Sequence, residues 1–171
     1  MVIDTLHFAR SAQVMDGQLP AISCTRLCQD LPAVQPGVFE WRLAGRTDAE
    51  RSDAARAWLD VQARGSVRVI CQRCLAPFDL ELCVDNTLAL VDDTAQLEAM
   101  DALESEGHGP ETEYLVADPR LDVQALIEDE LILVLPYAPV HDVCPGAEAA
   151  QDLADTNRPS PFAALAQLRK R

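Results

Sequence analysis

The stretch VICQRCLAPFDLELCV, residues 69–84, joins two β-rich runs through two cysteines that stand two residues apart. The runs are GSVRVICQRC and PFDLELCVDNTLALV, and only Leu75 and Ala76 lie between them, followed by the rigid Pro77. Runs of this composition at this spacing favour an antiparallel hairpin. Residues on the second run alternate between an apolar face, Phe78, Leu80, Leu82 and Val84, and a mainly polar face, Asp79, Glu81, Cys83 and Asp85.

The residues before the hairpin extend a β-rich region over 37–91. VFEWRLAGR, which begins at Val38, alternates in polarity with the period of a half-buried strand. SDAARAWLDVQARG, residues 52–65, is rich in alanine and ends at Gly65, which predicts a short helix, with a strand extending up to Val61 as the alternative. Residues 1–36 mix short apolar clusters with prolines, so we expect an irregular N-terminal arm with brief turns of helix or strand.

The residues after the hairpin contain one strong helix signal. RLDVQALIEDELILVLP, residues 120–136, has the N-cap residue Asp122, the stop residue Pro136 and an apolar stripe at helical spacing. We expect the stripe to pack on the sheet through Leu126, Ile127, Leu131 and Val134. Residues 92–113 have weak periodicity and include EGHGP, which predicts a long flexible acidic loop. The tail, 146–171, is predicted to contain a short C-terminal helix.

Together these patterns predict an α+β fold in one domain over 1–171. An antiparallel β-sheet packs against a central helix, with the acidic loop over 92–113, a helix and extended segment over 114–145, and the short C-terminal helix. A chain of 171 residues has the length of one sizeable domain.

The charge is strongly uneven along the chain. The formal net charge is −14, and thirteen acids face one base between Asp92 and Glu130. Nucleic-acid backbones are bound by clustered cations, and no basic stripe occurs before Arg169, Lys170 and Arg171. The acidic run is interpreted as a solvated loop or as a docking surface for a basic partner. No signal peptide or apolar span is evident, so we expect a cytoplasmic protein and no membrane contact.

Two pairs of metal-ligand residues occur at short spacing. Cys71 and Cys74 form a C-x2-C pair, and HDVC supplies His141 and Cys144, so a Cys3His zinc site is a candidate. The pairs are separated by 66 residues, and only the fold can bring them together. A redox pair at Cys71 and Cys74, or four buried spectators, are the alternatives. Cys24, Cys28 and Cys83 are interpreted as spectators.

No catalytic constellation is evident in the sequence. Phosphate-binding glycine loops, nucleophile elbows and H-E-x-x-H are missing, and the three consecutive acids Glu128, Asp129 and Glu130 point in different directions around a helix. We therefore expect a protein that is not an enzyme.

Four blocks in order resemble the bacterial large ribosomal RNA subunit accumulation protein, the YceD family. The blocks are CQRCLAPF, an acidic interval, LDVQALIEDELILVLPYAPVHDVC and PSPFAALAQLRKR, so the resemblance runs from about residue 65 to the C-terminus. FARSAQVMDGQLP, near the start, resembles the family more faintly. The resemblance implies a cytoplasmic factor without enzymatic activity that supports synthesis, processing or stability of 23S ribosomal RNA. It also implies a purpose for Glu128, Asp129 and Glu130, as a polar network or as a docking surface.

The leading hypothesis is therefore a noncatalytic ribosome-biogenesis factor that contacts a large-subunit precursor or a basic protein partner. Partner-binding candidates are Glu128, Asp129 and Glu130, and candidates for direct RNA contact are Arg68, Arg73, Arg169, Lys170 and Arg171. The alternatives are a zinc-stabilised protein-interaction module without an RNA role and a thiol-disulfide oxidoreductase that uses Cys71 and Cys74.

Overall fold

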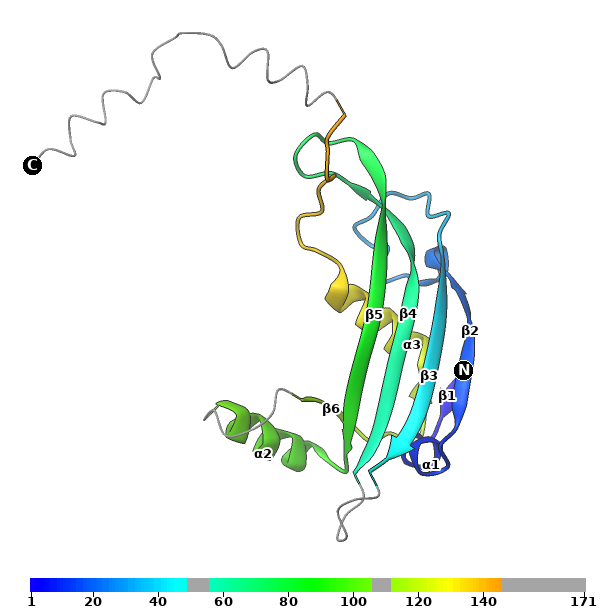
Figure 1. The fold of residues 1–171 in the computed structure, drawn as a ribbon, viewed down its shortest axis with the longest axis vertical. Coiled ribbons are helices and arrows are strands. Elements are labelled where there is room, and N and C mark those ends of the chain that lie inside the picture. The colour runs from blue at the N-terminus through cyan, green and yellow to red at the C-terminus, as the bar shows by residue number, and fades with distance from the viewer. Residues whose placement is uncertain (49–55, 106–111, 146–171) are drawn as a thin grey trace, which may run out of the picture.

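The computed structural model describes residues 1–48, 56–105 and 112–145 and confirms a mixed, mostly antiparallel α+β fold. Its main sheet has five strands in the order β2-β3-β4-β5-β6 (Figure 1). A small second sheet pairs β1 with β7. The strands of the main sheet are β2 (Val14–Pro20), β3 (Val38–Thr47), β4 (Ala57–Ile70), β5 (Pro77–Val91) and β6 (Glu113–Val116). β6 pairs in parallel with the end of β5, and the small sheet joins β1 (Val2–Ile3) to β7 (Leu121–Asp122) in antiparallel orientation.

The predicted hairpin is the longest feature of the fold. β4 and β5 pair without a break from Trp58 opposite Ala89 to Ile70 opposite Pro77. Alternate residues of β4 are buried under the helices, and the predicted faces of β5 are confirmed, since Leu82 and Val84 are buried whereas Asp79, Glu81, Cys83 and Asp85 are exposed. The strand predicted from Val38 is also confirmed, as β3.

The helix predicted over residues 52–65 is wrong from Ala57 onward, because β4 begins there. Leu59 and Val61, two residues apart, are both fully buried. Side chains at this spacing share one face of a strand, whereas on a helix they point in different directions. Gly65 is not a helix stop. A Cβ at this position would lie 2.5 Å from the carbonyl oxygen of Val38, so the close approach of β3 and β4 requires glycine.

The predicted central helix is confirmed as α3 (Val123–Val134), which lies across one face of the sheet (Figure 1). The side chain of Asp122 caps it by accepting a hydrogen bond from the backbone N–H of Gln124. Leu126, Ile127 and Leu131 are buried, as expected. Val134 is 39% exposed, so its predicted burial is wrong, because the last turn of α3 extends past β5 (Figure 1).

The flexible loop predicted over 92–113 is also wrong for most of its length. Residues Thr94–Ser105 form helix α2, which lies beside the end of β5 and the edge strand β6 (Figure 1). The Asp93 side chain accepts from the Gln96 N–H, and the Gln96 side chain accepts from the Asp92 N–H. These two caps, with their D-x-x-Q signature, and the helix-forming residues that follow explain the helix. Residues 106–111 and the predicted C-terminal helix lie outside the described residues.

The N-terminal arm is more regular than expected. After α1 (Thr5–Arg10), residues 14–20 are the edge strand β2 and pair along their whole length with β3. A short 3-10 turn, η1 (Ala21–Ser23), then leads into a segment that packs against α3. No helix among the described residues is long and apolar enough to cross a bilayer.

The packing of α3 gives a direct test of the core. Replacing the fully buried Leu131 with Ala should lower the free energy of unfolding by about 2–5 kcal/mol, because a cavity replaces a packed side chain. Val134→Ala is the control on the same helix and should cost less than about 1 kcal/mol, since the side chain is partly exposed already. Equal losses in urea denaturation would contradict this assignment of the buried face.

Candidate metal centre

The tip of the β4–β5 hairpin holds the first cysteine pair. The N–H of Cys71 donates to the carbonyl of Ala76 at 3.0 Å, and the N–H of Leu75 donates to the carbonyl of Cys71 at 2.9 Å. Leu75 adopts a left-handed conformation with φ of 62°, which closes the turn. No helix begins at Cys71, so the helix dipole that would favour a redox pair is not present at this turn.

The second pair reaches the tip through the extended segment after α3. Pro136 prevents the helix from continuing, and the carbonyl of Pro139 accepts a hydrogen bond from the N–H of Gln72 at 2.8 Å. The ring of His141 stacks on Phe78, with the centroids 4.3 Å apart. These contacts hold His141 and Cys144 beside the hairpin turn.

The four predicted ligands converge. One ligand atom from each of Cys71, Cys74, His141 and Cys144 lies within 4.8 Å of all the others. The Sγ atoms of Cys71 and Cys144 are 3.8 Å apart, and Cys74 Sγ lies 3.4 Å from His141 Nδ1. Ligands about 2.0–2.3 Å from a tetrahedral zinc ion are themselves roughly 3.5–3.8 Å apart. The cluster can therefore hold a metal such as zinc.

The surroundings of the sulfurs favour thiolate at one position. Burial opposes ionisation of Cys71, but backbone N–H groups of Cys74, His141 and Arg73 outweigh it and lower the pKa of the thiol to about 5. For Cys74 the backbone contact with Ala76 lowers the pKa, whereas burial and hydrogen bonding with the Cys144 and Cys71 sulfurs raise it above its usual value. A metal must displace the proton from Cys74, so metal binding should strengthen as the pH rises.

Residues 59–169 match the family described as large ribosomal RNA subunit accumulation protein YceD. The match covers both ligand pairs, most of the β4–β5 hairpin and all of α3. The chain belongs to the YceD family. This membership supports a role in the accumulation of large-subunit ribosomal RNA. No solved structure matches the chain.

The three acids of the YceD-family helix are used inside the fold. Glu128 is buried, and its Oε1 accepts hydrogen bonds from the N–H groups of Arg26 and Leu27 at 2.6 and 3.1 Å. The Arg26 guanidinium pairs with Glu128 at 3.1 Å and also with the exposed Asp129. Glu128 therefore connects the N-terminal arm to α3. This contact agrees with the interpretation of the three acids as a polar network. No signal in the sequence identifies Arg26 as the partner of Glu128.

Glu130 belongs to a second buried contact. It accepts a hydrogen bond from Asn86 of β5 at 2.9 Å, and Asn86 also donates to Glu113 at the start of β6. Burial raises the pKa of Glu130, the Asn86 hydrogen bond opposes the shift, and the neighbouring Glu113 and Asp129 add to it. Of the three candidate partner-binding acids, only Asp129 is exposed.

The candidate RNA-binding arginines are separated. Arg68 lies on the face of the sheet opposite α3, where it pairs with Asp79 at 2.8 Å. Arg73 lies at the hairpin tip, where its guanidinium contacts Cys144 and the carbonyl of His141. Arg169, Lys170 and Arg171 lie outside the described residues.

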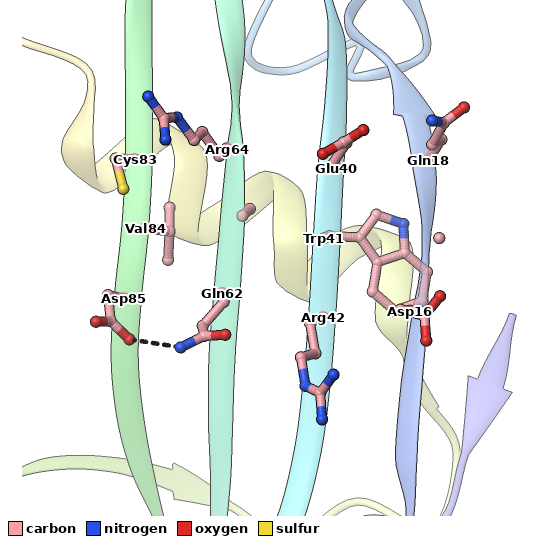
Figure 2. Close-up of a pocket in the computed structure, with 12 residues that line it drawn as sticks. Asp16, Gln18, Glu40, Trp41, Arg42, Gln62, Arg64, Cys83, Val84 and Asp85 are labelled. Carbon is pink, nitrogen blue, oxygen red and sulfur yellow. Dashed lines mark hydrogen bonds between the residues drawn. The ribbon is translucent and has the colours of Figure 1, made fainter.

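The open face of the sheet has a shallow pocket whose lining carries both charges. The lining includes two bases, Arg42 and Arg64, and three acids, Asp16, Glu40 and Asp85 (Figure 2). Gln62 donates a hydrogen bond to Asp85 at 3.1 Å. Along the same face, ion pairs join Arg46 to Asp60, Arg64 to Glu81 and Arg68 to Asp79. Among the residues that the structure describes, this face therefore has no continuous positive stripe.

The remaining cysteines lie outside the cluster, as expected. Cys24 is buried, and burial is the main cause that raises the pKa of its thiol to about 12. The Cys28 thiol donates to the carbonyl of Ala21, and Cys83 is exposed on the open face of the sheet. None of these three cysteines belongs to the cluster of four metal-ligand residues.

The cluster predicts one zinc ion per chain. Protein purified without chelator should contain stoichiometric zinc by elemental analysis, and Cys74→Ser should lose most of it. Cys83→Ser is the matched control and should keep the metal, because Cys83 lies away from the cluster. Removing the metal should speed amide exchange at residues 71–76 and 139–144 while α3 stays protected; unchanged exchange at both segments would contradict a structural role.

The position of Glu130 predicts a pH-dependent effect. The folded chain holds the Glu130 proton more tightly than the unfolded chain, so the associated stability is present below the usual pKa of 4.5 and is lost as pH rises through the folded value. Glu130→Gln keeps an acceptor for Asn86 and should therefore be more stable than the natural chain at pH 7, with the difference closing near pH 4. Glu98→Gln, on the exposed surface of α2, is the control. A less stable Glu130→Gln variant at pH 7 would contradict the prediction.

Proposed function

We propose that this chain is a noncatalytic large-subunit biogenesis factor whose Cys3His cluster is a structural zinc centre. The observation that carries the proposal is the ligand set, because Cys71, Cys74, His141 and Cys144 supply all four positions of a tetrahedron. A catalytic zinc site keeps one position open for water or substrate. Here all four positions can be filled by protein side chains, which would join the hairpin tip to the segment that follows α3.

The charges on the described surface favour a protein partner over direct RNA contact. Three arginines of the open face, Arg46, Arg64 and Arg68, each have an acidic neighbour within 4 Å, so these three add little net positive charge there. Phosphate binding requires cations that can replace counterions, and mixed charges of this kind do not supply them. The net charge of −14 also repels the phosphates of RNA at distances up to a Debye length of about 8 Å.

The partner is proposed to be a basic protein of the large-subunit precursor, bound through the acids around α2. Asp92, Asp93 and Glu98 are exposed there, and Glu113 is exposed at the start of the adjacent β6. Complementary charge raises association rates and excludes partners of the same charge. Glu128 and Glu130 are not available for this role because the fold buries them.

The proposal is tested by 23S ribosomal RNA accumulation in cells whose only copy of the gene carries a variant set. Asp92→Asn, Asp93→Asn and Glu98→Gln together remove three charges while asparagine keeps the cap of α2. This set should lower 23S accumulation and association with the large-subunit precursor. Arg68→Ala with removal of residues 169–171 is the opposing set and should leave both at the natural level.

The two sets separate the possible outcomes, provided that circular dichroism shows each variant to be folded. Loss with the arginine set alone would replace the protein-partner proposal by direct RNA contact. Normal 23S levels with both sets and with Cys74→Ser would instead indicate a zinc-stabilised interaction module without an RNA role. A disulfide that cycles between Cys71 and Cys74 in cells would favour the oxidoreductase alternative.

A further inference from the structure

Arg73 stands between the two hairpin cysteines and contacts both halves of the cluster, although it cannot ligate a metal. Its backbone N–H donates to Cys71 Sγ at 3.4 Å, and its side-chain Nε donates to Cys144 Sγ at 3.0 Å. Its Nη2 donates to the carbonyl oxygen of His141 at 2.7 Å. One residue of the hairpin therefore holds two residues that lie about seventy positions further along the chain.

The charge of the loaded cluster gives this contact a physical purpose. Three thiolates, a neutral imidazole and a divalent ion sum to a net charge of −1. Cys71 is fully buried and Cys144 is 9% exposed, so this charge is partly removed from water. An anion in such a place needs a nearby cation or hydrogen-bond donors, and Arg73 supplies both.

The fork of the guanidinium also fixes geometry. Nε and Nη2 are held in one plane, so their two hydrogen bonds set the Cys144 sulfur and the His141 carbonyl at a fixed distance from the hairpin. The backbone N–H of His141 also donates a hydrogen bond to a sulfur of the cluster, Cys71 Sγ, at 3.4 Å. Lysine carries the same charge but cannot reproduce the planar fork.

We infer that Arg73 is a positioning residue of the metal centre, which neutralises the loaded Cys3His cluster and fixes Cys144 and the His141 backbone against the hairpin tip. The inference rests on the proposed metal centre. It also gives Arg73 a different role from the phosphate contact expected from the sequence, because its Nε and Nη2 already donate to a sulfur and a carbonyl of the cluster. Outer-shell partners of this kind orient the ligands and tune their affinity for metal.

The experiment measures zinc affinity by chelator competition for the full chain and for Arg73→Gln, Arg73→Lys and Arg64→Gln. Arg73→Gln should bind zinc about 10–100-fold more weakly, the usual effect of removing an outer-shell partner. Arg73→Lys should fall between the natural chain and Arg73→Gln, because it restores charge without the fork. Arg64→Gln is the control, since Arg64 lies on β4 away from the hairpin tip and pairs with Glu81 at 3.7 Å.

Cobalt substitution supplies a second readout that a general loss of stability would not move. The sulfur-to-cobalt absorption of Arg73→Gln should shift relative to the natural chain, because Cys144 loses its hydrogen bond, whereas Arg64→Gln should give the natural spectrum. If Arg73→Gln binds zinc within twofold of the natural chain and has the same spectrum, the inference is overturned while the metal centre stands. If the natural chain binds no zinc, both the metal centre and the inference fail.

Discussion

The β4–β5 ladder is the constraint on which the rest of the structure depends. Thirteen consecutive residue pairs fix its register from Trp58 and Ala89 to Ile70 and Pro77. Because side chains alternate along a strand, this register decides at once which residues face α3 and which face solvent. It also decides where Cys71 and Cys74 stand, since the ladder ends at the turn that contains them. A slip of one residue would turn the buried row of β4 to solvent and move the cysteines away from His141 and Cys144.

The metal centre joins this ladder to the other long-range element of the fold. α3 packs across the hairpin through Leu126, Ile127 and Leu131, and its end at Val134 sends the chain back toward the hairpin tip. The centre therefore closes a loop that runs from the tip through β5, α2 and α3. Closing a long loop removes much conformational freedom from the unfolded chain, so a bound metal stabilises an arrangement that the sheet and helix already favour. Buried Glu128 holds the N-terminal arm to the same helix.

The sequence predicts those elements that are marked by a local motif or by a periodic pattern of apolar residues. The alternation after Pro77, the cap at Asp122 and the two short ligand pairs each carry their own signal, and each was found where it was expected. The first half of β4 has alanines that favour a helix, and it is a strand because it pairs with β3 and β5, which a local pattern does not reveal. The cap of α2 does have a local signal, the D-x-x-Q pattern that begins at Asp93, so this helix is predictable from the sequence. The Arg26–Glu128 and Arg73–Cys144 contacts could not be predicted, because each joins residues that only the tertiary fold brings together.

The account as a whole depends on a metal held by three sulfurs and one nitrogen at the hairpin tip. Zinc K-edge X-ray absorption of the protein purified without chelator tests this ligand set directly. The account predicts a single four-coordinate shell with three sulfur neighbours at about 2.3 Å and one imidazole nitrogen at about 2.0–2.1 Å. A first shell made of oxygen neighbours, or a shell with two sulfurs and an open position filled by water, would contradict it.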